Sequence, residues 1–252
     1  MARWASIEVP AGGPEGNFPS LGRDEVHLWR IALAVDQVQR ERFHSLLSPD
    51  ERDRREGYRF DLHRDRFTVR RGALRLLLGA YTGIDPASLR FELSPHQRPE
   101  LDAAHGVPSL AWNLTDSDDL ALLAVTRDAG VGVDLESVRG IAELEALVAS
   151  HFSPAEQAEF AALPAESRLT AFYLGWTRKE AWLKAQGVGL GGDLQGFSVT
   201  LSPRRPARLL WVAGDPAARM RWRFHTVAPA PGAVAAVVVE RRPSRLRCFD
   251  LR

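Results

Sequence analysis

The sequence is organised around residues 176–184, which read WTRKEAWLK. Lysine and arginine together number 33, yet the only lysines are Lys179 and Lys184, both inside this segment. Arginine stays protonated in proteins, whereas lysine can release a proton near neutral pH when its surroundings lower its pKa. The placement of both lysines here predicts that one of them takes part in proton transfer.

Glu180 and Lys184 lie four residues apart, so a helix brings their side chains to one face, one turn from each other. An ordinary surface ion pair has the same spacing, and the spacing alone leaves both interpretations open. Trp176, Trp182 and Leu183 give the helix an apolar flank. We therefore expect the helix to pack against the core while Glu180 and Lys184 face an edge or a cleft.

A second informative segment is residues 131–136, which read VGVDLE. On a strand, strict alternation places the three large apolar residues on one face and Gly132, Asp134 and Glu136 on the other. Two carboxylates on one face repel each other unless a cation lies between them, and oxygen ligands of this kind suit magnesium. Gly132 would leave room for a ligand to approach. A solvated strand face is the alternative interpretation.

Two helix starts in the sequence match each other, SPDE at residues 48–51 and SPAE at residues 153–156. Both are capping boxes with proline at the first helical position. A strand precedes each box, and a basic or candidate catalytic helix and further strands follow it. The repeat predicts an α/β (α+β) chain of two similar halves, residues 26–128 and 129–240, with the active-site cleft between them.

Local patterns complete the expected organisation. Residues 1–25 are rich in glycine and proline and predict a flexible N-terminal tail, and residues 241–252 predict a basic C-terminal tail. A polar turn is expected at residues 112–119. Strands are expected at residues 89–93, 120–126, 197–201, 208–213, 220–227 and 233–240, the last of them central.

Composition and charge exclude several classes of protein. The net charge of +1 over 252 residues argues against a general nucleic-acid binder. The arginines from Arg52 to Arg75 fit either phosphate binding or solvated helix faces paired with neighbouring carboxylates. No apolar run is long enough to span a membrane, and the single cysteine, Cys248, cannot form an internal disulfide. We therefore predict a cytoplasmic protein with no membrane or nucleic-acid partner.

Several segments occur together in one order and spacing: WNLT at residues 112–115, GVDLE at 132–136, FSPAE at 152–156, WTRKEAWLK at 176–184 and GVGL at 187–190. Taken jointly, they resemble the surfactin-synthetase-type (Sfp-type) 4′-phosphopantetheinyl transferases. The segment QRP at residues 97–99 also lies where that family has a Gly-Lys-Pro segment. The resemblance extends from about residue 26 to residue 240.

The resemblance implies a pseudo-two-fold pair of α/β halves that bind coenzyme A and magnesium, or manganese, in the cleft between them. By that match, Asp134, Glu136 and Glu180 hold the metal. Glu180 or a metal-bound water would take the proton from the serine of an apo-acyl or peptidyl carrier protein. Lys184 would protonate the departing 3′,5′-ADP.

The same match assigns further residues to coenzyme A. Lys179, Arg98 and Thr115 fall where the family contacts phosphates or the nucleotide, and Arg66 falls where it contacts the 3′-phosphate. Asp116 stands where relatives usually have a histidine that meets phosphate. Either Asp116 points elsewhere or joins the metal shell, or coenzyme A binds weakly, or the chain uses another donor or has lost catalysis.

The leading hypothesis is an enzyme that transfers phosphopantetheine from coenzyme A to a carrier-protein serine. The alternative is a relative with an altered donor or lost catalysis that binds a carrier protein or a nucleotide. A nucleic-acid-binding protein is a third hypothesis, and the net charge speaks against it. We expect the carrier protein to contact residues 137–160, with Ile141, Leu144 and Leu147 on a short helix. Because two halves already form the cleft, we predict a monomer.

Overall fold

The computed structural model describes residues 3–9, 18–94, 99–107, 110–187, 192–240 and 245–252. Arg98, expected at the nucleotide, lies outside these ranges, and so does most of the GVGL segment. No helix in the described part of the chain is long and apolar enough to cross a membrane.

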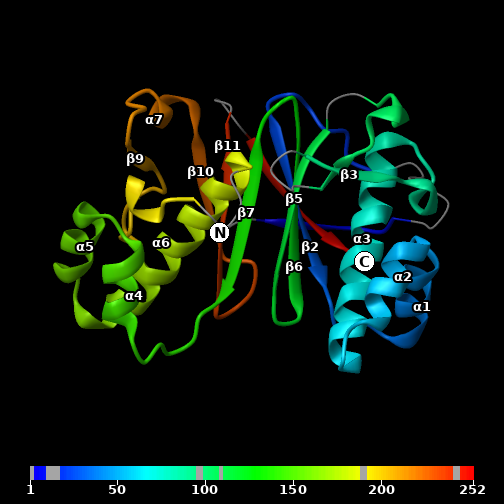
Figure 1. Cartoon of the computed structure of the whole chain (residues 1–252), viewed down its shortest axis with the longest axis horizontal. Helices are drawn as coiled ribbons and strands as arrows, with labels where there is room; N and C mark the ends of the chain where they lie inside the picture. Colours follow the sequence, from blue (N-terminus) through cyan, green and yellow to red (C-terminus); the bar gives the residue numbers. More distant parts are fainter. Residues whose placement is uncertain (1–2, 10–17, 95–98, 108–109, 188–191, 241–244) are drawn as a thin grey trace.

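The N-terminal half runs from a strand through three helices to a hairpin and two further strands (Figure 1). Its elements are β2 (Glu25–Ala32), α1 (Gln37–Ser45), α2 (Pro49–Glu56), α3 (Asp61–Thr82), η1 (Pro86–Ser88), β3 (Phe91–Leu93), β4 (Pro99–Leu101), η2 (Ala103–His105), β5 (Leu110–Ser117) and β6 (Leu120–Arg127).

The C-terminal half repeats this order of elements. Its elements are β7 (Val131–Ser137), α4 (Leu144–His151), α5 (Pro154–Ala161), α6 (Ala165–Gln186), η4 (Leu194–Gly196), β8 (Phe197–Val199), β9 (Leu209–Val212), α7 (Ala218–Arg221), β10 (Arg223–Val227) and β11 (Ala233–Val239). Neighbouring strands follow the order β2-β6-β5 in one sheet and β7-β11-β10 in the other, and all of these pairs are antiparallel. The expectation of two similar α/β halves is therefore confirmed.

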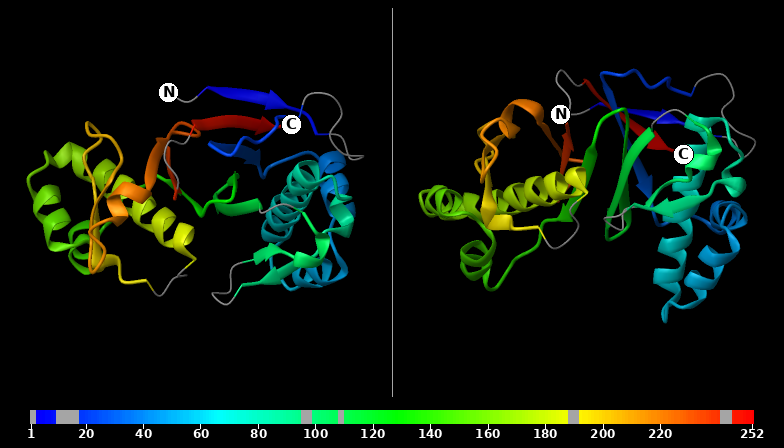
Figure 2. Two further views of the ribbon diagram at one scale, coloured as in Figure 1. Left: turned by 90° about the horizontal axis from the view of Figure 1, so that it is seen from above. Right: turned by 45° about the horizontal axis from the view of Figure 1, so that its top comes forward.

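The two sheets lie between the helices of the two halves, as both views in Figure 2 show. Each half has its own apolar core between its helices and its sheet, and a third apolar cluster joins the two sheets. Val131, Val133 and Leu135 belong to this third cluster, as strand alternation predicted. Asp134 and Glu136 consequently face the opposite way, toward α6.

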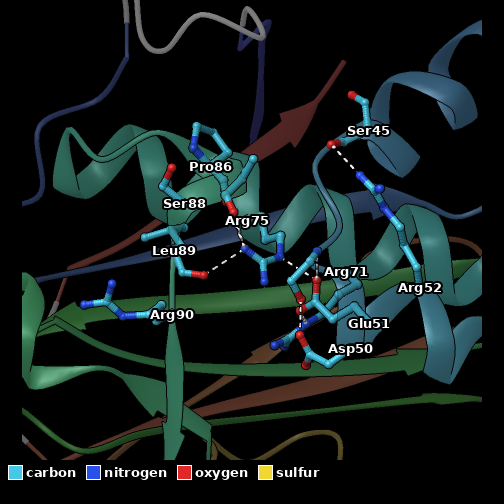
Figure 3. A network of polar contacts seen from close by, with 12 residues as sticks. Ser45, Asp50, Glu51, Arg52, Arg71, Arg75, Pro86, Ser88, Leu89 and Arg90 are labelled. Atoms are coloured by element: carbon cyan, nitrogen blue, oxygen red, sulfur yellow. Dashed lines mark hydrogen bonds and ion pairs between the residues drawn. The ribbon is translucent and has the colours of Figure 1, made fainter.

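The two capping boxes extend into ion pairs that bind the short helix to the long one. In the N-terminal half, Glu51 accepts a hydrogen bond from the Ser48 amide and pairs with Arg71 and with Arg75, whose Nε lies 2.5 Å from its carboxylate (Figure 3). Arg75 also donates to the carbonyl oxygens of Pro86 and Leu89, as Figure 3 shows. The buried glutamate thus fixes α2 against α3.

In the C-terminal half, the Glu156 carboxylate accepts hydrogen bonds from the amides of Ser153 and Val199 and from Lys179 Nζ, at 2.6 to 2.8 Å. A single carboxylate therefore caps α5, binds α6 and anchors β8. Because Glu156 and Lys179 are both fully buried, this ion pair belongs to the core of the half.

Both ends of the chain differ from the tails that were expected. The strands β1 (Trp4–Ile7) and β12 (Arg245–Leu251) pair in parallel with each other, and β12 also pairs in parallel with β2. Alternating Leu246 and Cys248 contribute to the cluster between the sheets, which explains why a basic segment forms a strand.

Two internal segments also differ from expectation. Most of the polar residues 112–119 belong to β5, because they pair with β6 as far as Ser117; only Asp118 and Asp119 form a turn. The strand expected at residues 220–227 begins with the short helix α7 and becomes β10 only at Arg223. The expectation that residues 233–240 form a central strand is confirmed, since β11 lies between β10 and β7.

Candidate active site

The candidate site lies where the two halves meet, beside Lys184 of α6. The Lys184 Nζ donates to Asp134 Oδ1 of β7 at 2.6 Å and to Thr115 Oγ1 of β5 at 3.4 Å. The Asn113 Oδ1 of β5 accepts the Val133 amide of β7 at 2.8 Å, which holds the two strands side by side. The structure thus brings together two predicted site residues of the C-terminal half with one of the N-terminal half.

The carboxyl groups of Asp134, Glu136 and Glu180 lie near one another at this site. Burial raises the pKa of Asp134, and the neighbouring Lys184 ammonium opposes this rise. Burial also raises the pKa of Glu136 and of Glu180, and the charge of Asp134 raises both further. The side chains predicted as metal ligands are therefore close enough to repel one another, which a bound cation would relieve.

The donor set fits a hard divalent cation in its chemistry. All three side chains offer carboxylate oxygens, the ligands that magnesium prefers. Asp134 Oδ2 is buried and has no hydrogen-bond partner among the described residues. Within the same residues, no three acidic, histidine or cysteine side chains converge as a finished set of metal ligands. In this structure the ammonium of Lys184 is the cation that faces Asp134.

Gly132 serves helix packing rather than ligand approach. A Cβ at this position would lie 2.0 Å from the Ala181 carbonyl oxygen and 2.5 Å from the Ala185 amide nitrogen. Only glycine allows the α6 backbone to lie this close to β7. The close approach places Glu180 and Lys184 beside the strand that carries Asp134 and Glu136.

Lys179 lies in a different place from the one expected for a nucleotide-binding residue. It is fully buried in the core of the C-terminal half, where it pairs with Glu156 and donates to the Phe197 carbonyl oxygen at 2.8 Å. Its Nζ also lies 4.2 Å from the centre of the Phe197 ring. A phosphate cannot reach this ammonium without opening the core.

The basic residues of α3 reach the end of β5. Arg66 binds Asp119 through two nitrogens at 2.9 and 3.0 Å, and Arg70 forms an ion pair with the exposed Asp116. Asp116 therefore points toward α3, where a guanidinium offsets its charge. This is one of the arrangements that the sequence left open for the carboxylate at the usual histidine position.

Sequence reasoning missed some neighbours of the site. Asn113 belongs to the quoted WNLT segment, but its bond across to β7 had no signal in the sequence. The ring of His151 in α4 lies 5.4 Å from that of Trp176. Burial raises the pKa of Glu180, and the interaction with His151 offsets part of this rise. Burial likewise raises the pKa of Glu136, and a hydrogen bond from Trp176 offsets part of that rise. The spacing of the two segments gave no means of pairing α4 with α6.

Carboxylates and a lysine at the boundary of two similar α/β halves, with arginines nearby on α3, define an enzyme of phosphoryl-group transfer. Comparison with known proteins narrows this class. Residues 130–238 match the family model of the 4′-phosphopantetheinyl transferase superfamily. The chain is 38% identical over 216 residues to the 4′-phosphopantetheinyl transferase HetI of Nostoc sp., covering 86% of this chain and 88% of that one. The chain therefore belongs to the 4′-phosphopantetheinyl transferases.

Other similar proteins include the 4′-phosphopantetheinyl transferase Sfp of Bacillus subtilis, 28% identical over 170 residues, which cover 66% of this chain and 72% of that one. Among solved structures, the holo-[acyl-carrier-protein] synthase of Thermotoga maritima aligns with 46% of this chain and 64% of that one, at 24% identity and a TM-score of 0.36.

Proposed function

We propose that the protein transfers the 4′-phosphopantetheine group of coenzyme A to a serine of an apo-acyl or peptidyl carrier protein and releases 3′,5′-ADP. The observation that carries this proposal is the meeting of Lys184, Asp134 and Thr115 between the two halves of a member of this family. At such a boundary, residues of both halves can contact the same bound ligand.

The residues of the site suit the bond changes of this reaction. A bond forms between the serine oxygen and the phosphorus that carries pantetheine, while the bond from that phosphorus to 3′,5′-ADP breaks. Glu180, with its raised pKa, would accept the serine proton, because a base with a pKa nearer neutrality transfers protons more effectively. Lys184 would supply a proton to the departing phosphate, and its ammonium would meanwhile offset negative charge.

A divalent cation completes the proposed site. Asp134, Glu136 and Glu180 would hold magnesium, or manganese, and Lys184 would release Asp134 Oδ1 to it. When bound, the cation would neutralise charge on the pyrophosphate of coenzyme A. Chelation with EDTA should abolish turnover and added Mg²⁺ should restore it, with Glu136→Gln raising the Mg²⁺ concentration needed. Full turnover in EDTA would contradict this part of the proposal.

For the nucleotide we propose Arg66 and Thr115, with Arg70 as an additional residue. In the structure Arg66 and Arg70 bind Asp119 and Asp116, so phosphate would exchange with carboxylate partners. Because Asp116 is held by Arg70, its charge is offset, which favours the transferase over a relative with an altered donor or lost catalysis.

For the carrier protein we propose contact with residues 137–160. Ile141, Leu144 and Leu147 pack partly against the core of the C-terminal half, which leaves part of each side chain exposed. Leu144→Ala should raise KM for the carrier protein several-fold and leave KM for coenzyme A unchanged. Equal KM values for the carrier in both proteins would exclude this surface.

We also propose that the enzyme acts as a monomer in the cytoplasm, without nucleic acid or membrane. One chain already supplies both sides of the site, and its single cysteine, Cys248, is buried. Sedimentation of the purified chain with and without a carrier protein would test the oligomeric state.

The deciding experiment is intact-mass spectrometry of apo-carrier proteins of both types, incubated with the protein, coenzyme A and Mg²⁺. We expect the mass of one phosphopantetheine to be added, lost in Glu180→Gln and retained in Glu92→Gln, which removes an exposed carboxylate of β3. No addition to any carrier would overturn the proposal. Addition that appears only in Asp116→His would favour the altered relative instead.

A further inference from the structure

A large cavity lies away from the candidate active site. The sheets of the two halves approach each other along β5 and β7, and this cavity of about 1040 Å³ lies between their opposite edges, β10 on one side and the β1–β12 pair on the other. Figure 1 shows β7 and β10 on opposite sides of β11. None of the residues assigned to the active site lines the cavity. Its volume is at the upper end of the range for small-molecule sites, about 300 to 1,000 Å³.

The walls of this basic cavity carry positive charge without acidic residues. Seven arginines and His225 line it, and no aspartate or glutamate does. Arg3, Arg208, Arg223 and Arg245 form no ion pair with any residue of the described ranges. Like charges gathered in one concave space repel each other and raise the local concentration of anions.

The remaining surface arginines are only weakly compensated. Arg205 lies 3.8 Å from a carboxylate oxygen of Glu159, and Arg247 lies 3.5 Å from one of Glu25. Both carboxylates also accept hydrogen bonds from backbone amides, so they do not serve the arginines alone. The cavity therefore keeps most of its positive charge.

Arg178 gives the cavity a buried cation that makes no ion pair with a carboxylate of the described residues, although the charge of Glu159 acts on it. Its side chain comes from α6 and is 2% exposed. It donates to the Thr200 carbonyl oxygen at 2.6 Å and to Thr226 Oγ1 at 2.9 Å, while its Nε has no hydrogen-bond partner in the described part of the chain. A buried charge without a counterion in direct contact is poorly compensated, and an anion in the cavity would compensate it.

The imidazole of His225 is affected by the positive charge of the cavity. Burial lowers its pKa to about 4, and the charge of Arg223 lowers it further. An anion placed among these groups would favour the protonated imidazole and raise this pKa. His225 is thus a natural probe of occupancy, whereas His151 of α4 does not line the cavity.

We propose that the basic cavity binds a small polyanion that carries two or more phosphate groups. Guanidinium groups bind phosphate through paired hydrogen bonds, and seven of them around one cavity exceed what a single phosphate needs. A concave volume of about 1040 Å³ is of the size that a small molecule fills. The site would act beside the proposed transferase activity and does not depend on it.

The test follows the ring resonances of His225 and His151 by NMR in the full chain while inorganic tripolyphosphate is added, with His225→Gln for assignment. Coenzyme A is left out, because it carries several phosphate groups and would itself compete for the cavity; the His151 resonance reports any binding at the active site. We expect tripolyphosphate to shift the His225 resonance and raise its titration midpoint, with little change at His151. ATP in a parallel titration distinguishes recognition of phosphate alone from recognition of a nucleoside triphosphate.

Variants of equal net charge distinguish binding in the cavity from general attraction of the anion to a basic protein. Arg208→Glu with Arg223→Glu should weaken tripolyphosphate binding at least tenfold, whereas Arg23→Glu with Arg59→Glu changes the net charge equally outside the cavity and should leave binding unchanged. All four positions are exposed, so folding should persist. An unchanged His225 resonance, or equal weakening by both double variants, would overturn the proposal. Loss of carrier-protein binding alone would make the cavity a protein contact and would also overturn it.

Discussion

The two halves of the molecule share a framework but differ in what it carries. Helices α3 and α6 each have 22 residues, and their fifteenth residues are Arg75 and Lys179. Both cations are buried against the glutamate of the preceding capping box, Glu51 or Glu156. The shared ion pair is therefore part of the fold, and it accounts for a buried cation at the fifteenth position of each helix.

The difference between the halves begins at the next residue of the same helices and recurs one turn beyond it. The sixteenth and twentieth residues are Leu76 and Ala80 in α3, both in the apolar core, but Glu180 and Lys184 in α6. The N-terminal half closes this face with apolar contacts, while the C-terminal half opens it toward β5. The candidate site therefore lies on a face of α6 whose equivalent in α3 packs into the apolar core.

The largest effect should come from making α6 resemble α3 at its twentieth residue. Lys184→Ala removes the ammonium that faces Asp134, so turnover should fall about a thousandfold, within the range for loss of general acid–base catalysis. Lys184→Arg should also lose most turnover, because a guanidinium keeps its proton. Rates of carrier modification measure both, and wild-type rates in Lys184→Arg would contradict the assigned role. Urea unfolding should show a loss of stability as well in Lys184→Ala, because buried Asp134 loses its cation, so stability is measured beside turnover.

The next effect concerns the shared framework. Lys179→Met leaves Glu156 without its cation in the core, which should lower the free energy of unfolding by about 3–5 kcal/mol. Arg75→Met is the matched variant of the N-terminal half and should have an effect of similar kind. Urea denaturation measures both. If Lys179→Met instead raised KM for coenzyme A without loss of stability, Lys179 would bind phosphate as the sequence had predicted.

A smaller effect concerns the pH dependence of stability, to which one buried histidine in each half contributes. Burial lowers the pKa of His27, in the N-terminal half, from 6.5 to about 4, although Glu25 opposes the shift. Because the folded state favours the neutral ring, this stability is present above pH 6.5 and is lost as the pH falls toward 4, by about 3 kcal/mol in total. His27→Gln should flatten this pH dependence in urea unfolding. His225→Gln, in the C-terminal half, should flatten it by a similar amount, because burial lowers the pKa of His225 to about 4 as well.

The smallest effect concerns a pair at the surface of the N-terminal half. Asp116→Asn removes the partner of Arg70, and exposed ion pairs contribute about 0.2–1 kcal/mol. Stability should therefore change by less than about 1 kcal/mol, while KM for coenzyme A should fall a few-fold because Arg70 is released. A rise in KM would show that Asp116 contributes to the site, for example through the metal shell.

Much of the fold was predictable from the sequence because its signals are local. The two capping boxes, the alternation of residues 131–136 and the apolar strand at 233–240 each follow from neighbouring residues alone. The pairing of β12 with β1 and β2 was not predictable, because it joins residues separated by most of the chain. Basic side chains also hid the alternation of Leu246 and Cys248.

The candidate site was predicted in part. Asp134, Glu180 and Lys184 were selected from rare residues and strand alternation, and Lys184 does reach Asp134. The role of Lys179 depended on which way α6 faces, and one residue of difference turns a side chain by about 100°. The role of Gly132 depended on the distance between α6 and β7, which no pattern in the sequence specifies.

The position of β12 has a consequence for how the protein forms. β12 lies between β1 and β2 in the sheet of the N-terminal half, yet it follows the whole C-terminal half in the sequence. During synthesis, the first half therefore leaves the ribosome with the edge of β2 unpaired until residues 245–251 emerge. Such an edge can pair with other chains, so slow elongation between the halves should favour aggregation, and a separately expressed β12 peptide should suppress it.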